Sequence, residues 1–451
     1  MISEEANSIT EIASETSVEA PAPAKADWNI ATRITFRFLF CYFGLYIFNI
    51  LANTATSLLP WLRYPIQAYQ NVWERVVPWV GVHILHLDHP AKRVIPSGSG
   101  DQTFNWVQVF CYLALAVLGT ILWSVLDRKR KEYRRLHSGF IIAIRYAVAL
   151  TMINYGMVKL IKLQMPSPTL ERLVEPYGDF SPMGVLWQFM GTSTAYEFFG
   201  GAGEMLGSLL LFFPKTALLG ALVTAGVMLN VVVMNFCYDT PVKLLSSHLV
   251  LMCIFIIAPD LKRLAGFFVF NRPVPPAHDL LPMFPARWVK WASVALKTVV
   301  IGFALYNHTM SSIQQQYTRG LKAPKPDLFG IWEVEEFKRN GEALPPLTTD
   351  SIRWRKVIIG GTNRLTLRMM NDATRGFAAD YKVKEKTIEL TDNQDKAKST
   401  FKFNRPDFEH LTVEGTFNGD TVAAKMRRVD ETKMLLLSRG FHWISEVGMN
   451  R

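Results

Sequence analysis

The stretch "FFGGAGEMLGSLLLFF", residues 198–213, decides the class of fold, because it is an apolar helical segment close to the length of a membrane span. A helix needs about 20 mainly apolar residues to cross a bilayer. Similar runs recur along the chain, of which 49% is apolar and only 19% charged. The sequence therefore predicts an α-helical polytopic membrane protein with about seven spans. The expected spans are 34–57, 104–126, 139–163, 194–213, 216–237, 245–259 and 289–308.

The loop "DRKRKEYRRLHS", residues 127–138, sets the expected orientation. Lysine and arginine gather in the short loops that stay on the cytoplasmic side of a membrane. The next loop, 164–193, holds only Arg172 against three carboxylates. We therefore expect a multi-pass protein of the bacterial inner membrane with a cytoplasmic amino terminus. Residues after about 309 are then periplasmic.

The amino-terminal tail, the net charge and the domain boundaries can be interpreted from composition. Residues 1–29 are acidic and rich in Ser, Ala, Thr and Pro, which is typical of a disordered tail rather than a signal peptide. Much of the net charge of +11 comes from the membrane-flanking loops, so we expect no nucleic-acid partner. The expected domains are the tail, 1–29; two spans with an extracytoplasmic loop, 30–138; a four-helix membrane unit, 139–265; a cytoplasmic loop and last span, 266–317; a linker, 318–327; and a β-domain, 328–451.

Cysteine and histidine side chains are the candidate metal ligands of this sequence. The four cysteines have no C-x-x-C spacing, so we expect buried small side chains rather than a zinc site or a disulfide framework. His83, His86 and His89 recur every third residue and would share a helical face. However, Pro90 follows them and no H-E-x-x-H pattern is present. We expect a short interfacial helix there, and no metal site in the chain.

The residues after the linker alternate between apolar and polar side chains, and turn signals such as Asn418-Gly419 separate the runs. About eight or nine successive antiparallel strands favour an up-and-down β-barrel, which has no exposed edge, over another small barrel or a sandwich. The expected strands are 330–337, 352–359, 364–370, 377–384, 387–391, 400–403, 411–417, 421–428 and 434–438.

Two residues of this domain carry a resemblance to the lipocalin-like families. Gly330-x-Trp332 opens the first expected strand, and Arg439 follows the last. In those families the tryptophan plugs one barrel end and a late arginine packs over it, which gains a cation–π attraction. The resemblance implies the same contact between Trp332 and Arg439. The closing segment "SRGFHWISEVGMNR", 438–451, is expected to dock on the barrel or on the membrane bundle; the alternative is that it binds a ligand.

Glu204 places a carboxylate inside the apolar stretch 198–213. At the bilayer centre a charged side chain costs at least about 2.5 kcal/mol, so it normally has a partner or a function. Gly203 and Gly207 form a G-x-x-x-G pattern that lets another helix approach, so the carboxylate should point into the bundle. Lys159, on the preceding span, is the expected partner. A buried pair of this kind can be a structural salt bridge or a functional site.

Other polar side chains of the same spans are expected to gather with this pair in a pocket at the outer end of the bundle. Glu204, Lys159 and His248 are the candidates for any catalytic step. The candidate binding residues are Tyr155, Tyr196, Glu197, Asn235, Asp239 and Lys243. Several also have a structural explanation, since lysines snorkel to the interface, tyrosines form aromatic belts and asparagines join helices.

The block 139–265, with "NYGMVKLIKLQ", "FFGGAGEMLGSLLLFF" and "NFCYDTPVKLLSSHLVLM", resembles the DoxX family of bacterial membrane proteins. Members of that family have a four-helix membrane unit with one helix that bears glycines and a glutamate. The resemblance implies a link to redox chemistry, because one member is a subunit of a thiosulfate:quinone oxidoreductase and others associate with redox-defence proteins. The vitamin K-dependent carboxylase-like family is a more distant analogy without a matching catalytic motif.

The leading hypothesis is a membrane protein of the DoxX type that takes part in redox chemistry near the quinone pool. Quinone is its candidate cofactor and a redox protein its candidate partner, because the sequence has no haem attachment motif, dinucleotide loop or iron–sulfur cysteines. If the chain is an enzyme, it is a component of a membrane oxidoreductase. The alternative is a non-enzymatic protein whose barrel captures a lipid or apolar small molecule. A transporter is disfavoured, because no inverted repeat is evident.

Overall fold

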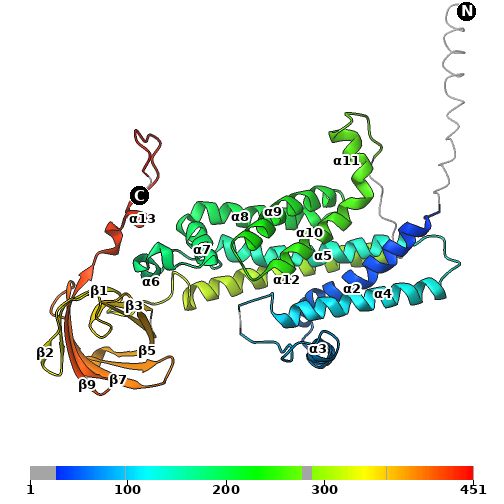
Figure 1. Ribbon diagram of the computed structural model, residues 1–451. Coiled ribbons are helices and arrows are strands. Elements are labelled where there is room, and N and C mark those ends of the chain that lie inside the picture. Colours follow the sequence, from blue (N-terminus) through cyan, green and yellow to red (C-terminus); the bar gives the residue numbers. More distant parts are fainter. Residues whose placement is uncertain (1–26, 97, 277–286, 362, 450–451) are drawn as a thin grey trace, which may run out of the picture.

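The computed structural model describes residues 27–449, except for 97, 277–286 and 362. Figure 1 shows two parts, a unit of long helices and a β-barrel at one end of it. Residues 1–26 of the expected tail and 277–286 of the expected cytoplasmic loop lie outside the described residues.

Within the described residues, five helical segments are long and apolar enough to cross a membrane. They are α2 (Ile30–Leu58), α4 (Thr103–Leu126), α5 (Arg134–Leu160), α9 (Ala217–Cys237) and the run from α10 (Lys243–Ile257) through α11 (Leu261–Phe268). The expected spans 194–213 and 289–308 are the helices α8 (Thr194–Phe212) and α12 (Arg287–Thr318), which are not among these five. Two glutamates lower the hydropathy of α8.

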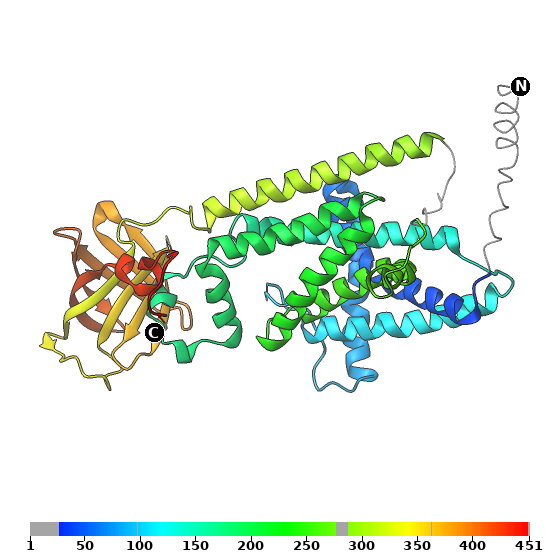
Figure 2. The same ribbon diagram turned by 90° about the horizontal axis from the view of Figure 1, so that it is seen from above.

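The connection between α2 and α4 holds an amphipathic helix, α3 (Arg63–His83), which buries Trp73 and Val77 against its neighbours. It runs across the direction of the long helices, as the two views together show (Figures 1 and 2). The helix ends at His83, and His86 has a left-handed backbone with φ of 52°. The expectation of a helix through the three histidines is therefore wrong. No group of three or more His, Cys, Asp or Glu side chains in the described part could hold a metal ion.

The C-terminal domain is a closed antiparallel barrel in which strands that are consecutive in sequence are neighbours. The short strand β2 (Glu342–Ala343) pairs only with the last two residues of β1. Pairs from Ile331 with Val429 to Arg339 with Val422 join β1 to β9 and close the barrel. The expected barrel is thus confirmed, and a sandwich is excluded. Its strands are β1 (Gly330–Arg339), β3 (Trp354–Gly361), β4 (Arg364–Met369), β5 (Thr374–Lys382), β6 (Thr387–Asp392), β7 (Lys398–Asn404), β8 (His410–Phe417) and β9 (Asp420–Val429).

Large apolar side chains fill the inside of the barrel. The ring of Trp354 lies 5.7 Å from that of Phe401 and 5.5 Å from that of Phe417, between ring centroids. Phe377 packs against Phe417 in turn, with the ring centroids 5.8 Å apart. A ligand inside the barrel, as the alternative hypothesis requires, would have to displace these rings.

The expected strand 434–438 is wrong, because this segment forms a short helix, α13 (Leu435–Ser438). β9 already pairs with β1, so the closed barrel offers no free edge for another strand. Asp430 also turns the chain away from the barrel. Its carboxylate accepts a hydrogen bond from the backbone N–H of Thr432 at 3.1 Å.

The expected contact of Arg439 with Trp332 is also wrong. Trp332 is fully buried at one end of the barrel, but the guanidinium above its ring is that of Arg405, 5.6 Å from the ring centroid. Arg439 lies in the exposed segment after α13, where it contacts Met449. The described part of this segment, through Met449, does not dock as expected, and the side chain of Trp443 is 91% exposed.

A small helix, α6 (Leu170–Val174), joins the helical unit to the outside of the barrel. Ile331 and Ile358 point outward from the barrel, yet they are only 0% and 1% exposed because they pack in one apolar cluster with Leu170. Arg368 of β4 donates a hydrogen bond to the carbonyl oxygen of Val174. The barrel is therefore held against the loop between α5 and α8.

Candidate functional site

Lys159 of α5 and Glu204 of α8 form the ion pair that the sequence predicts, and their side chains are only 7% and 2% exposed. The two helices approach closely because glycines lie between them. A Cβ atom on Gly201 would meet the carbonyl oxygen of Gly156 and the Cβ of Lys159, both at 2.9 Å. Gly156 and Gly201 thus bring the two charged side chains together.

The other glycines of α8 face α9. A Cβ on Gly207 would lie 2.4 Å from the hydroxyl oxygen of Thr224, and one on Gly203 would lie 3.4 Å from Val227. The predicted G-x-x-x-G pattern therefore packs against α9, while Glu204 between the two glycines turns towards α5. One helix with small residues on two faces can accept a close neighbour on each.

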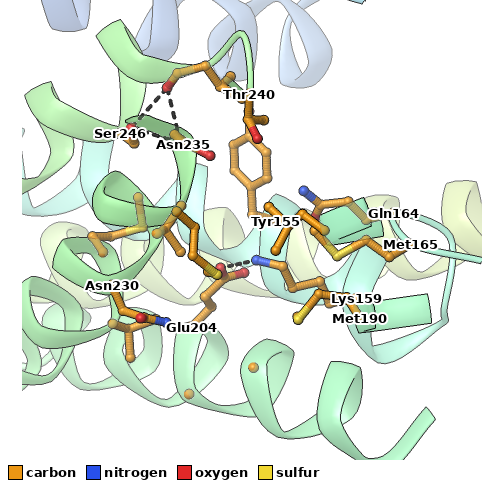
Figure 3. A pocket seen from close by; sticks show the side chains of 18 of the residues that line it. Tyr155, Lys159, Gln164, Met165, Met190, Glu204, Asn230, Asn235, Thr240 and Ser246 are labelled. Carbon is orange, nitrogen blue, oxygen red and sulfur yellow. Dashed lines mark hydrogen bonds and ion pairs between the residues drawn. The ribbon is translucent and has the colours of Figure 1, made fainter. Parts of the chain in front are cut away.

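Beside the ion pair lies a cavity of about 200 Å³, between the α5 end nearest the barrel and the helices α8, α9 and α10. Apolar side chains form most of its wall, among them Trp187, Met190 and Met234. Figure 3 shows Lys159 and Glu204 meeting at the middle of this cavity, with Asn230 on one side and Thr240 on another. The pair is thus in contact with the cavity and is not sealed between helices.

Several polar atoms at this cavity lack a protein partner. Within the described residues, Glu204 Oε2, Gln164 Oε1 and Thr240 Oγ1 are buried without a hydrogen bond. The side chains of Tyr155 and Asn230 also line the cavity. Buried polar groups are normally paired, so unpaired ones that converge on a cavity indicate a place for a ligand or water.

Four further predicted residues lie at or beside the cavity. Tyr196 lines it and is 44% exposed, whereas Asn235 donates a hydrogen bond to Ser246 Oγ at 3.0 Å. Glu197 is fully buried, and one of its carboxylate oxygens accepts the backbone N–H of Met165 at 3.0 Å. Tyr155 lines the wall. Glu197 and Asn235 therefore position the loop and helices around the cavity.

His248, Asp239 and Lys243 do not belong to this site, contrary to the prediction. The His248 ring lies between α10 and α2, where Nε2 is 2.6 Å from the Tyr42 hydroxyl and the ring stacks on Tyr46 at 3.9 Å. Its Nδ1 lies 2.6 Å from the Leu244 carbonyl oxygen, which can only accept, so Nδ1 carries the proton. Asp239 is 85% exposed and pairs with Lys243 at 2.8 Å, away from the cavity.

The wall formed by α7 (Pro182–Thr192) and by the turn after α5 was not predicted from the sequence. Trp187 and Met190 come from α7, and Gln164 comes from the turn. The Ser181-Pro182 pair was the available signal, because serine caps a helix whose first position is proline. Ser181 Oγ accepts the backbone N–H of Gly184 at 3.1 Å.

The uncharacterized protein YwoB of Bacillus subtilis (strain 168) is 34% identical over 124 residues, which cover 28% of this chain and 79% of that protein. No protein-family model matches the sequence. No solved structure matches the chain.

Proposed function

Because the chain belongs to the same family as the uncharacterized Bacillus subtilis protein YwoB, whose name states no activity, we propose a function from the cavity itself. The helical unit binds an apolar small molecule with a polar end, of the quinone class, in the cavity beside Lys159 and Glu204. The observation that carries this proposal is a buried ion pair at a mainly apolar cavity, in which one carboxylate oxygen has no partner among the described residues.

The size of the cavity suits one ring. A dry apolar cavity of about 150 Å³ holds benzene. The cavity beside the ion pair has about 200 Å³, so a substituted six-membered ring fits. The apolar walls from α7 and α9 suit the ring faces and the first carbons of an attached chain.

The polar groups suit the two ends of a quinone. A quinone carbonyl accepts hydrogen bonds, and the Lys159 ammonium, the Tyr155 hydroxyl and the Asn230 amide can donate them at this cavity. Reduction of a quinone to a quinol takes up two electrons and two protons. In this proposal a redox partner protein delivers the electrons, and the Lys159–Glu204 pair passes protons to the ring oxygens. This role agrees with the resemblance of block 139–265 to the DoxX family.

The alternative function is non-enzymatic binding of a lipid or another apolar molecule in the same cavity. The predominance of apolar side chains in the cavity wall favours it, because an acyl chain would fill such a space equally well. The barrel is not the binding compartment in this alternative, since aromatic rings occupy its interior.

The identity of the ligand that co-purifies with the protein distinguishes the two functions. The full chain would be purified in mild detergent, its apolar ligands extracted and identified by mass spectrometry, and a short-chain quinone analogue titrated by calorimetry. Tyr155→Phe should weaken quinone binding about 2- to 10-fold, the value of one hydrogen bond. Tyr238→Phe is the matched control, because Tyr238 lies outside the cavity lining. Saturable lipid retention without quinone binding would support the alternative and reject the redox function.

We also propose that the protein lies in the bacterial inner membrane with the barrel in the periplasm. The basic loop before α5 and the barrel lie at opposite ends of the helical unit (Figure 1). Because positive loops stay in the cytoplasm, the barrel should be outside. Protease added to spheroplasts should remove the barrel from the full chain. A barrel that is protected until the membrane is disrupted would reverse this orientation.

A further inference from the structure

A second groove lies where the barrel meets α6 and α7, separate from the cavity at the ion pair. Figure 2 shows this junction between the barrel and the helical unit. The groove has a volume of about 930 Å³ and is lined by residues of α6, α7, β3, β4 and α13. Its lining combines four cationic side chains with apolar walls.

The cations of this groove are Arg172, Arg355, Lys356 and Arg368. Arg172 pairs with Glu175 at 2.6 Å, while Arg355 and Arg368 share Asp372 at 2.7 and 2.9 Å.

Lys356 forms no ion pair or hydrogen bond within the described part of the chain, although Glu333 lies opposite it on β1. Even with Glu333 counted, the groove has an excess of positive charge. Burial lowers the pKa of the half-buried Lys356, and Arg355 and Arg368 lower it further, while Glu333 and Asp372 act in the opposite direction. Burial thus disfavours the charged form of the amine, and an anion bound in the groove would stabilise it.

The other wall of the groove is apolar and reaches the end of the helical unit. Leu435 and Leu436 of α13 line it on the barrel side, and Phe189 of α7 lines it on the helix side, where its side chain is 60% exposed. Phe189 packs edge to face on Tyr196, at the start of α8, with the ring centroids 5.5 Å apart.

Phe198 and Phe199 follow Tyr196 on α8 and are also exposed. An exposed tyrosine at a helix end, such as Tyr196, is typical of the level of the lipid headgroups. The cations of the groove thus lie next to that level.

We propose that this groove binds the headgroup of an anionic phospholipid. Lys356 and the adjacent guanidinium groups hold the phosphate, and the first part of an acyl chain lies against Phe189 and Leu436. The inference rests on the proposed membrane location but not on the ligand of the helical cavity. Such a lipid would fasten the barrel to the membrane surface and to α7, which is also a wall of the helical cavity.

The test uses the full chain in nanodiscs of phosphatidylcholine with a small fraction of phosphatidylglycerol. Co-elution of the protein with the discs tests the membrane location, and the lipids retained after transfer to detergent, measured by native mass spectrometry, test the groove. We expect phosphatidylglycerol to be enriched on the protein, and Lys356→Gln to reduce that enrichment at least threefold.

Lys402→Gln is the matched control, because Lys402 is an exposed lysine of β7 that does not line the groove. Equal enrichment in both variants would overturn the proposal. It would also be overturned if inorganic phosphate displaced the lipid at low millimolar concentration, since the groove would then be a site for free anions.

Discussion

Removing one partner of the Lys159–Glu204 pair should destabilise the helical unit strongly. The two side chains are 7% and 2% exposed, so Glu204→Gln leaves an ammonium, and Lys159→Met a carboxylate, without a counter-ion in a buried place. Loss of one partner of a buried pair costs about 3–5 kcal/mol. If the sites were independent, the two changes together would cost about 6–10 kcal/mol.

We expect the double variant Lys159→Met with Glu204→Gln to cost less than either single change, because it leaves no unpaired charge. The free energy of unfolding would be measured for the full chain by circular dichroism in mixed micelles of a mild detergent and dodecyl sulfate. Asp239 and Lys243 provide a matched control pair, since Asp239 is 85% exposed. Changes in that pair should cost about 0–1 kcal/mol and should not depend on each other strongly.

Additive costs for Lys159→Met and Glu204→Gln would refute the reasoning, because they would show that the two charges do not stabilise each other. A double variant that unfolds like the wild type but no longer binds the quinone analogue would show that the pair serves ligand binding rather than stability.

Three further changes test other parts of the structure. Gly201→Ala should destabilise the helical unit by about 1–3 kcal/mol through overpacking. Gly226→Ala is the control and should not, because its added Cβ meets nothing within 4 Å. Equal free energies of unfolding for the two variants would contradict the close contact between α5 and α8. Arg405→Ala should destabilise the barrel by about 1–2 kcal/mol, because it removes the guanidinium above Trp332 and its hydrogen bond. Arg439→Ala should leave the thermal unfolding of the barrel unchanged. A larger loss of stability in Arg439→Ala would instead support the contact between Arg439 and Trp332. Burial raises the pKa of Asp392, but a backbone N–H group and a neighbouring guanidinium outweigh it and hold the pKa below the ordinary 3.8. The ionised carboxylate therefore stabilises the barrel above about pH 4, and this contribution disappears as the pH falls through the lowered pKa. Asp392→Asn should reduce the loss of barrel stability as the pH falls below about 4, measured as the free energy of unfolding against pH. An unchanged pH dependence would show that Asp392 does not contribute to this loss.

The sequence by itself determined the properties that depend on neighbouring residues along the chain. The length of apolar runs identified the long helices, because a helix of known rise must match the bilayer. Alternation of side chains identified the strands of the barrel, and the Asn418-Gly419 pair identified a hairpin whose two residues have φ of 51° and 89°. The Lys159–Glu204 pair was also predictable, because a buried charge on one span needs a partner on the next.

Tertiary structure alone decided which elements meet. His248 has the chemistry of a site residue, but the packing of α10 on α2 places it against Tyr42 instead of the cavity. Arg405 rather than Arg439 covers Trp332, because the closure of β9 on β1 leaves the last residues outside the barrel. The wall from α7 depends on how the segment between α5 and α8 packs at the end of the helical unit nearest the barrel. Periodicity determines which face of an element is apolar, whereas the partner of that face depends on the packing of all elements together, and no local pattern encodes it.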